Sequence, residues 1–185
     1  MQKYLRRIYV YKNVDIYQIR GKIFVQGYAT TNGIIDLPYG PIVRVNENDV
    51  LGLGKAIIGA LDSCNDQVIP YTSNWGSMSK PMIKETECKS WKDFVQSTKY
   101  VLIELEMQTL IFTPVKVTGY GRHHRDYERL NDKIIEMQHA LVQGFFRRFL
   151  AVINRGPAYN LDPEKVGQNA LKALENYESI FSKNT

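Results

Sequence analysis

The hydrophobic and polar positions of residues 3–45 follow the pattern of antiparallel strands. β-branched and aromatic residues dominate three stretches of this region, as is typical of strands. The strands are expected at 5–11, 14–19 and 23–30. Gly21 and the dipeptide Asn32-Gly33 separate or follow them, and Asn-Gly is a strong signal for a tight hairpin. Two prolines in 37–41 predict a rigid turn before 42–45, which leads into the first helix.

A second pair of strands is expected at 100–107 and 109–117. In the first of these, apolar residues at 101, 103, 105 and 107 occupy alternate positions, which places Glu104 and Glu106 together on the other face. Paired carboxylates could perform acid–base chemistry. Solvent-facing strand residues are the favoured interpretation.

Helical spacing replaces alternation between Asn48 and Ser63. The apolar residues of this helix recur at Val50, Leu53, Ile57 and Leu61. Asn48 or Asp49 is the expected N-cap. A row of small residues, Gly52, Ala56 and Ala60, predicts that another element approaches this helix closely.

The same helix contains glycines that resemble a nucleotide-binding loop. Gly52 and Gly54 begin a dinucleotide fingerprint, but Ile57 occupies its third glycine position. Gly54-Lys55 matches the end of a P-loop, but Asp49 and Ala56 replace its first glycine and its hydroxyl residue. We therefore interpret the segment as a packing helix.

The region 64–89 is polar and is predicted to be a long loop that contains Trp75. A short helix should begin after Ser90, which has an acidic residue, Asp93, three positions later. Helical spacing is expected from Tyr127 to Asn154. A last helix should begin at Asp162-Pro163-Glu164, a strong start signal.

These elements predict an α+β fold. A twisted antiparallel sheet would pack against helices and be followed by a C-terminal helical hairpin. Residues 1–125 would form the sheet with its packed helices, and 126–185 the C-terminal helices of the same domain. The length of 185 residues suits one domain with a real core.

The net charge of +5 is concentrated in residues 1–45, which hold seven basic and two acidic side chains. The same stretch contains six of the twelve tyrosines. Such a face could bind single-stranded nucleic acid, or it could bind a protein, because tyrosine and arginine dominate hot spots. Tyrosines also favour sheets for structural reasons alone.

Cys64 and Cys88 show no spacing typical of a metal site or a disulfide framework. We therefore expect reduced thiols in a cytosolic protein. No apolar run has the length of a membrane span. The cluster Arg122-His123-His124-Arg125 is the main catalytic candidate, as a general base or a metal ligand. The only other histidine is His139, and no nucleophile motif is present. Surface or structural histidines are favoured over catalysis.

Four segments together resemble one known family. They are Leu37-Pro38-Tyr39-Gly40, the helix from Leu51 to Ser63, Ser90-Trp91-Lys92-Asp93-Phe94, and Tyr100-Val101-Leu102-Ile103. This combination resembles the CdiI immunity proteins of contact-dependent growth inhibition, a family formerly described as a domain of unknown function. The resemblance covers about residues 20–120 and specifies a fold better than an activity.

The resemblance implies a bacterial cytoplasmic antidote without enzymatic activity. Such a protein binds the C-terminal toxin domain of a CdiA effector, often a ribonuclease, and covers its active site. It implies no catalytic residue, no cofactor and no metal. Because each immunity protein matches its own toxin, contact residues are chosen here from chemistry: Tyr39 and Trp75 as aromatic anchors, and Arg122, His123 and Arg125 as charged contacts.

Overall fold

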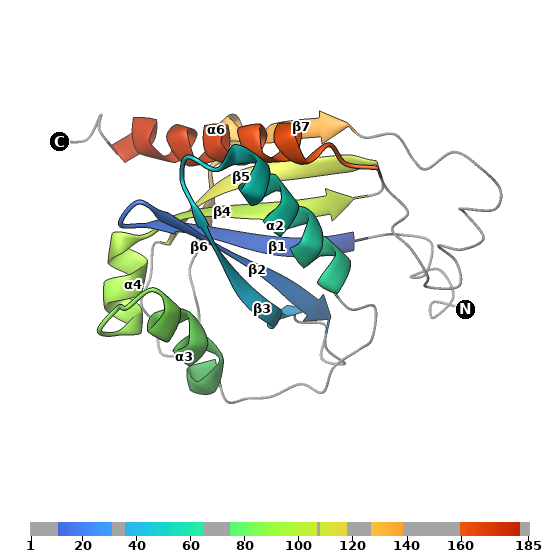
Figure 1. The fold of residues 1–185 in the computed structure, drawn as a ribbon. Coiled ribbons are helices and arrows are strands. Elements are labelled where there is room, and N and C mark those ends of the chain that lie inside the picture. The colour runs from blue at the N-terminus through green and yellow to red at the C-terminus, as the bar shows by residue number, and fades with distance from the viewer. Residues whose placement is uncertain are drawn as a thin grey trace, which may run out of the picture.

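A seven-stranded antiparallel sheet forms the centre of the molecule (Figure 1). The computed structural model describes residues 11–30, 36–64, 75–106, 108–117, 127–138 and 160–181. The strands are β1 (Tyr11–Ile19), β2 (Lys22–Thr30), β3 (Asp36–Asn46), β4 (Lys99–Glu106), β5 (Thr109–Val117), β6 (Tyr127–Arg129) and β7 (Ile135–Gln138). Their order is β3-β2-β1-β4-β5-β6, and β7 also pairs with β5. The predicted α+β class is confirmed.

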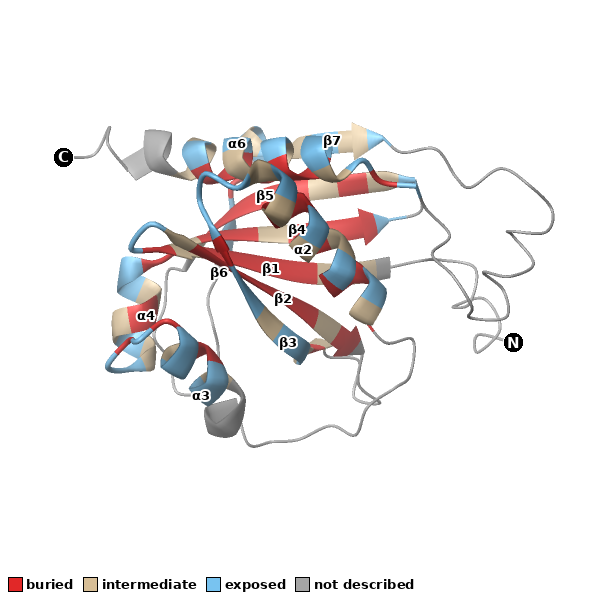
Figure 2. Ribbon diagram, viewed as in Figure 1, coloured by how far each residue is buried: buried red, intermediate tan, exposed pale blue. Residues whose placement is uncertain are grey.

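In the described part of the chain, two helices cover one face of this sheet. They are α2 (Val50–Ser63) and α6 (Pro163–Phe181), which lie side by side (Figure 1). Alternate residues of the strands, such as Val14, Ile16 and Ile103, are fully buried in the core beneath them (Figure 2). The helices contribute apolar residues at helical spacing, including Leu53 and Ile57.

The other face is packed at one end by α3 (Trp75–Glu85) and α4 (Trp91–Ser97). The intervening strand positions supply aromatic rings here. The Tyr17 ring stacks on Tyr100 at a centroid distance of 5.0 Å and meets Phe94 of α4 edge-on at 5.1 Å. Met82 brings α3 into the same cluster. The sheet is therefore a middle layer with helices on both sides.

The predicted helix starts are confirmed by their caps. The Asp49 side chain accepts a hydrogen bond from the Gly52 amide, and Ser90 accepts one from the Asp93 amide. At α6 the Asp162 side chain accepts from the Glu164 amide at 3.0 Å. The predicted turn at Gly21 is also confirmed, since Arg20 and Gly21 have positive φ values of 51° and 72° between β1 and β2.

The close approach predicted for α2 occurs, but Gly54 provides it on the α6 side. A Cβ built on Gly54 would overlap the carbonyl oxygen of Pro163. Gly167 of α6 has the same relationship to the carbonyl oxygen of Val50. On the sheet side, the Ala60 carbonyl oxygen lies 2.9 Å from a Cβ built on Gly27. Glycine on both helices allows their backbones to touch.

The helix expected from Tyr127 to Asn154 is wrong over its described part. Residues 127–138 form β6, a 3-10 turn η1 (Asn131–Lys133) and β7. In β7 the partly buried Ile135 and Met137 alternate with exposed Glu136 and Gln138, a period of two that matches pairing with β5. The spacing of Leu130 and Ile134 only mimics a helical stripe, because Ile134 is exposed. Residues 139–159 lie outside the described part.

Two predicted irregular segments are regular in the structure. The loop expected over 64–89 contains α3, which accommodates Pro81 in its interior. The rigid turn expected over 37–41 belongs to β3, an edge strand of the sheet. Proline is tolerated on an edge strand because its missing N–H can face away from the neighbouring strand.

Candidate functional site

The edge strand β3 carries the exposed aromatic residue that the sequence singled out. Tyr39 is 38% exposed, and Val43 on the same strand is 36% exposed. Tyr39 lies opposite Gly27 of β2, and its neighbour Gly40 has a φ of +80° beside the Ser63 hydroxyl at the end of α2. The placement of Tyr39 is thus compatible with the predicted role of an anchor at a sheet edge.

The pairing of β3 with β2 is irregular next to Tyr39. Val43 lies opposite Val25, whereas Tyr39 lies opposite Gly27. Two steps along β2 therefore correspond to four steps along β3, so that β3 carries extra residues at this point. The extra length moves Pro41 away from a regular ladder position.

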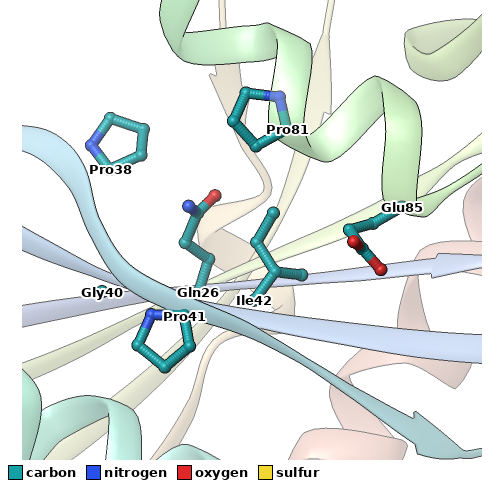
Figure 3. A pocket seen from close by; sticks show the side chains of 7 residues that line it. All are labelled: Gln26, Pro38, Gly40, Pro41, Ile42, Pro81 and Glu85. Carbon is teal, nitrogen blue, oxygen red and sulfur yellow. The ribbon is translucent and has the colours of Figure 1, made fainter.

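A pocket of about 380 Å³ lies between this bulge and α3 (Figure 3). Its lining residues come from three elements that are separated in sequence. They are Gln26 of β2, Pro38, Gly40, Pro41 and Ile42 of β3, and Pro81 and Glu85 of α3. The volume is near the lower end of the range for ligand sites, which suits a single side chain better than a large cofactor.

A buried carboxylate beside Gln26, on the same face of the sheet, accepts hydrogen bonds from several tyrosines. Asp15 lies opposite Gln26 in the β1–β2 ladder and is 1% exposed. It accepts hydrogen bonds from the hydroxyls of Tyr17 at 2.5 Å, of Tyr100 at 2.8 Å, and of Tyr28. Three phenol donors allow this carboxylate to remain buried. They also hold the tyrosine rings in fixed positions.

This arrangement bears on the nucleic-acid interpretation. Of the six tyrosines in 1–45, Tyr17 is buried and Tyr28 is committed to Asp15. A buried ring cannot stack on a base. Tyr39 is the one described tyrosine of that stretch whose side chain is exposed.

The carboxylate pair of β4 has two different environments. Glu106 is exposed as expected, but Glu104 is 4% exposed, so the expectation that both face solvent is wrong. Arg129 of β6 forms a bidentate ion pair with Glu104, at 2.8 and 2.9 Å. β6 pairs with β5, which lies between β6 and β4, so the Arg129 side chain extends across β5 to Glu104. Glu104 thus has a structural partner.

Cys64 is buried at the end of α2. Its thiol donates to the Asn13 carbonyl oxygen at 3.2 Å and accepts from the Tyr28 amide at 3.4 Å. Burial raises the pKa of the Cys64 thiol above its ordinary value of 9.0. The thiol is therefore protonated and poorly nucleophilic at neutral pH.

The other predicted contact residues cannot be compared with this geometry. Trp75 is the first residue of α3, but its side chain lies outside the described part. Arg122, His123 and Arg125 also lie outside it, as do His124 and His139. Within the described ranges no cluster of three or more His, Cys, Asp or Glu residues could hold a metal ion. No helix in those ranges is long and apolar enough to cross a membrane.

Gln26 and Glu85 were missed as candidate site residues. The alternation of β2 was sufficient to place Gln26 on one face with Phe24 and Tyr28. Pro81 and Glu85 are four residues apart and share one side of a helix. This spacing was not used, because residues 64–89 were predicted to form a loop.

Solved structures share this fold. The chain is similar to a protein of unknown function from Neisseria meningitidis, with a TM-score of 0.62, 12% identity and coverage of 90% of this chain and 94% of that chain. It is also similar to a chain of the CdiA-CT/CdiI toxin and immunity complex from Yersinia pseudotuberculosis. There the TM-score is 0.59 at 12% identity, and the coverage is 89% of this chain and 96% of that chain. No protein-family model and no curated protein matches the sequence.

Proposed function

We propose that this protein is an immunity protein that binds and neutralises the C-terminal toxin domain of a contact-dependent growth inhibition effector. The observation that carries the proposal is the similarity, over nearly the whole length of both chains, to a chain of a toxin and immunity complex. The four sequence segments that resemble CdiI proteins support the same conclusion independently of that superposition. The toxin is expected to be a nuclease, by family resemblance a ribonuclease.

The described chemistry is better suited to binding than to catalysis. Asp15, the most buried carboxylate of the described residues, is surrounded by three phenol donors. Glu104 is held by Arg129, and the Cys64 thiol is kept protonated by burial. By contrast, Tyr39 is exposed on the edge strand, and its chain neighbours Pro38 and Gly40 line a pocket of side-chain size. Exposed aromatic residues are frequent anchors of protein interfaces.

A basic antidote for a nuclease presents an electrostatic difficulty. A nuclease cleft attracts phosphates and is therefore expected to be positive, as is this chain with its net charge of +5. Association is favoured when the two facing surfaces have opposite charge. The pocket between β3 and α3 offers a local solution, because Glu85 is the one ionisable residue among those that line it.

Co-expression tests the proposal. The toxin domain is taken from the effector gene that adjoins the gene for this protein, and it is produced with or without this chain. We expect growth to be restored by co-expression, and the two proteins to elute as one complex with a Kd in the nanomolar range or below, about −12 kcal/mol. An immunity protein from an unrelated toxin is the control and should not protect.

Two results would contradict the proposal. One is the absence of both protection and a complex. The other is growth arrest when this chain is produced alone, which would indicate the toxin component of such a pair. Tight binding to RNA or DNA that weakens steeply with salt would instead favour the nucleic-acid interpretation.

A further inference from the structure

The pocket between β3 and α3 has apolar walls. Pro38, Pro41 and Ile42 come from the bulged strand, and Pro81 faces them from α3 (Figure 3). Proline rings are rigid, so that a ligand meets preformed surfaces and little side-chain entropy is lost on binding. These walls suit the methylene stem of a long side chain.

A polar group points into the pocket from its base. Gln26 is 8% exposed, and its amide projects between the β3 residues and Pro81 (Figure 3). The Gln26 side chain lines the pocket, and its amide offers a ligand both a hydrogen-bond acceptor and a donor.

The pocket has one charged side chain in its lining. Glu85 lines it and is exposed, and no basic residue is among the lining residues. Glu85 is also the last residue of α3, where the carbonyl groups of the helix end carry partial negative charge. The Glu85 carboxylate is therefore the group in the pocket lining that can attract a cation.

We propose that this pocket receives an arginine side chain from the toxin domain, an inference that rests on the proposed immunity function. The stem of the arginine packs against Pro38, Pro41 and Ile42. The guanidinium donates hydrogen bonds to the Gln26 side-chain oxygen and to the Glu85 carboxylate. Arginine suits these two acceptors better than lysine, because its planar fork of donors can serve both and its face can lie on a proline ring. A basic toxin cleft would thus be engaged by a local acidic pocket of an otherwise basic protein.

A small probe tests the pocket without the toxin. N-acetyl-arginine amide is titrated into the ¹⁵N-labelled protein, and N-acetyl-citrulline amide, a neutral compound of nearly the same shape, is the control. We expect saturable shifts of the Gln26 side-chain amide and the Glu85 backbone amide with arginine, and at least threefold weaker binding with citrulline. Equal shifts with both compounds, or none at these two residues, would overturn the inference.

Matched variants test the pocket in the complex. Glu85→Gln removes the charge and keeps the shape, and Glu175→Gln removes an exposed charge from α6, on the other side of the sheet. We expect Glu85→Gln to raise the Kd for the toxin domain at least tenfold, and Glu175→Gln to change it less than twofold. Circular dichroism verifies that both variants are folded.

The outcomes separate the two proposals. If the wild-type protein binds the toxin but Glu85→Gln binds equally well, the pocket inference fails and the immunity function stands. If the wild-type protein does not bind the toxin, the immunity function fails. The arginine titration then decides alone whether the pocket takes a guanidinium group.

Discussion

The Cα of Gly54 in α2 lies directly against the backbone carbonyl of Pro163 at the start of α6, so that a Cβ at position 54 would overlap the carbonyl oxygen. The overlap involves backbone atoms, which cannot be relieved by rotation of a side chain. The contact fixes where α6 crosses α2, and both helices cover the same face of the sheet. Gly167, against Val50, holds the same crossing one step further along.

Gly54→Ala should destabilise the protein because the two helices must separate to admit the methyl group. We expect the free energy of unfolding, measured by urea denaturation, to fall by about 1–3 kcal/mol. Gly59→Ala in the same helix is the matched control, since nothing lies within 4 Å of a Cβ there. It should stabilise the protein by roughly 0.5–1 kcal/mol. Equal effects of the two substitutions would show that the helix crossing is not tight.

Asp15→Asn should destabilise the sheet, because an amide oxygen is a weaker acceptor than a carboxylate for the Tyr17, Tyr28 and Tyr100 hydroxyls. Hydrogen bonds to a charged group contribute about 1.5–3 kcal/mol each. They are not additive here, so we expect a loss of at least about 2 kcal/mol. Asp132→Asn, at an exposed position of η1, should change stability by less than about 0.5 kcal/mol. An unchanged free energy of unfolding in Asp15→Asn would contradict a structural role for this cluster.

The two partners of the Glu104–Arg129 ion pair should respond unequally to substitution. The Arg129 side chain is 50% exposed and the Glu104 side chain 5%. Arg129→Met leaves a buried carboxylate without its bidentate partner, whereas Glu104→Gln leaves an arginine that water can reach. We expect Arg129→Met to lower the free energy of unfolding by about 2 kcal/mol and Glu104→Gln by about 1 kcal/mol, measured by thermal or urea unfolding. Both values are set low because water screens the half-exposed arginine. A larger effect of Glu104→Gln would contradict this order.

Alkaline pH should destabilise the folded protein in part through Cys64. Burial raises the pKa of this thiol above 9.0 in the folded state, so the unfolded chain releases the proton first as pH rises. The contribution is fully present below pH 9 and is lost as pH rises toward the folded pKa. The slope can reach about 1.4 kcal/mol per pH unit for one group. We expect Cys64→Ala to show a shallower loss of stability above pH 9 than the wild type, and parallel curves would contradict the assignment.

Local signals in the sequence determined much of the fold. The caps at Asp49, Ser90 and Asp162 were predicted correctly because capping depends on residues only a few positions apart. The alternation of 100–117 gave β4 and β5, and the spacing from Val50 to Leu61 gave α2. The glycines of that segment lie within α2, as its spacing predicted. The α+β class followed from these elements.

Only the tertiary structure decided the features that depend on distant partners. Residues 37–39 are strand because β2 pairs with them, Pro38 included, and residues 135–138 are strand because they pair with β5. Glu104 is buried because Arg129 reaches it from a separate strand, which no pattern around Glu104 can reveal. The pocket joins Gln26, the β3 bulge and Glu85, whose proximity is created by packing of α3 on the sheet. Helix caps and alternation are set by neighbours in the chain, whereas strand pairing, burial of charge and pocket shape are set by residues that meet only after folding.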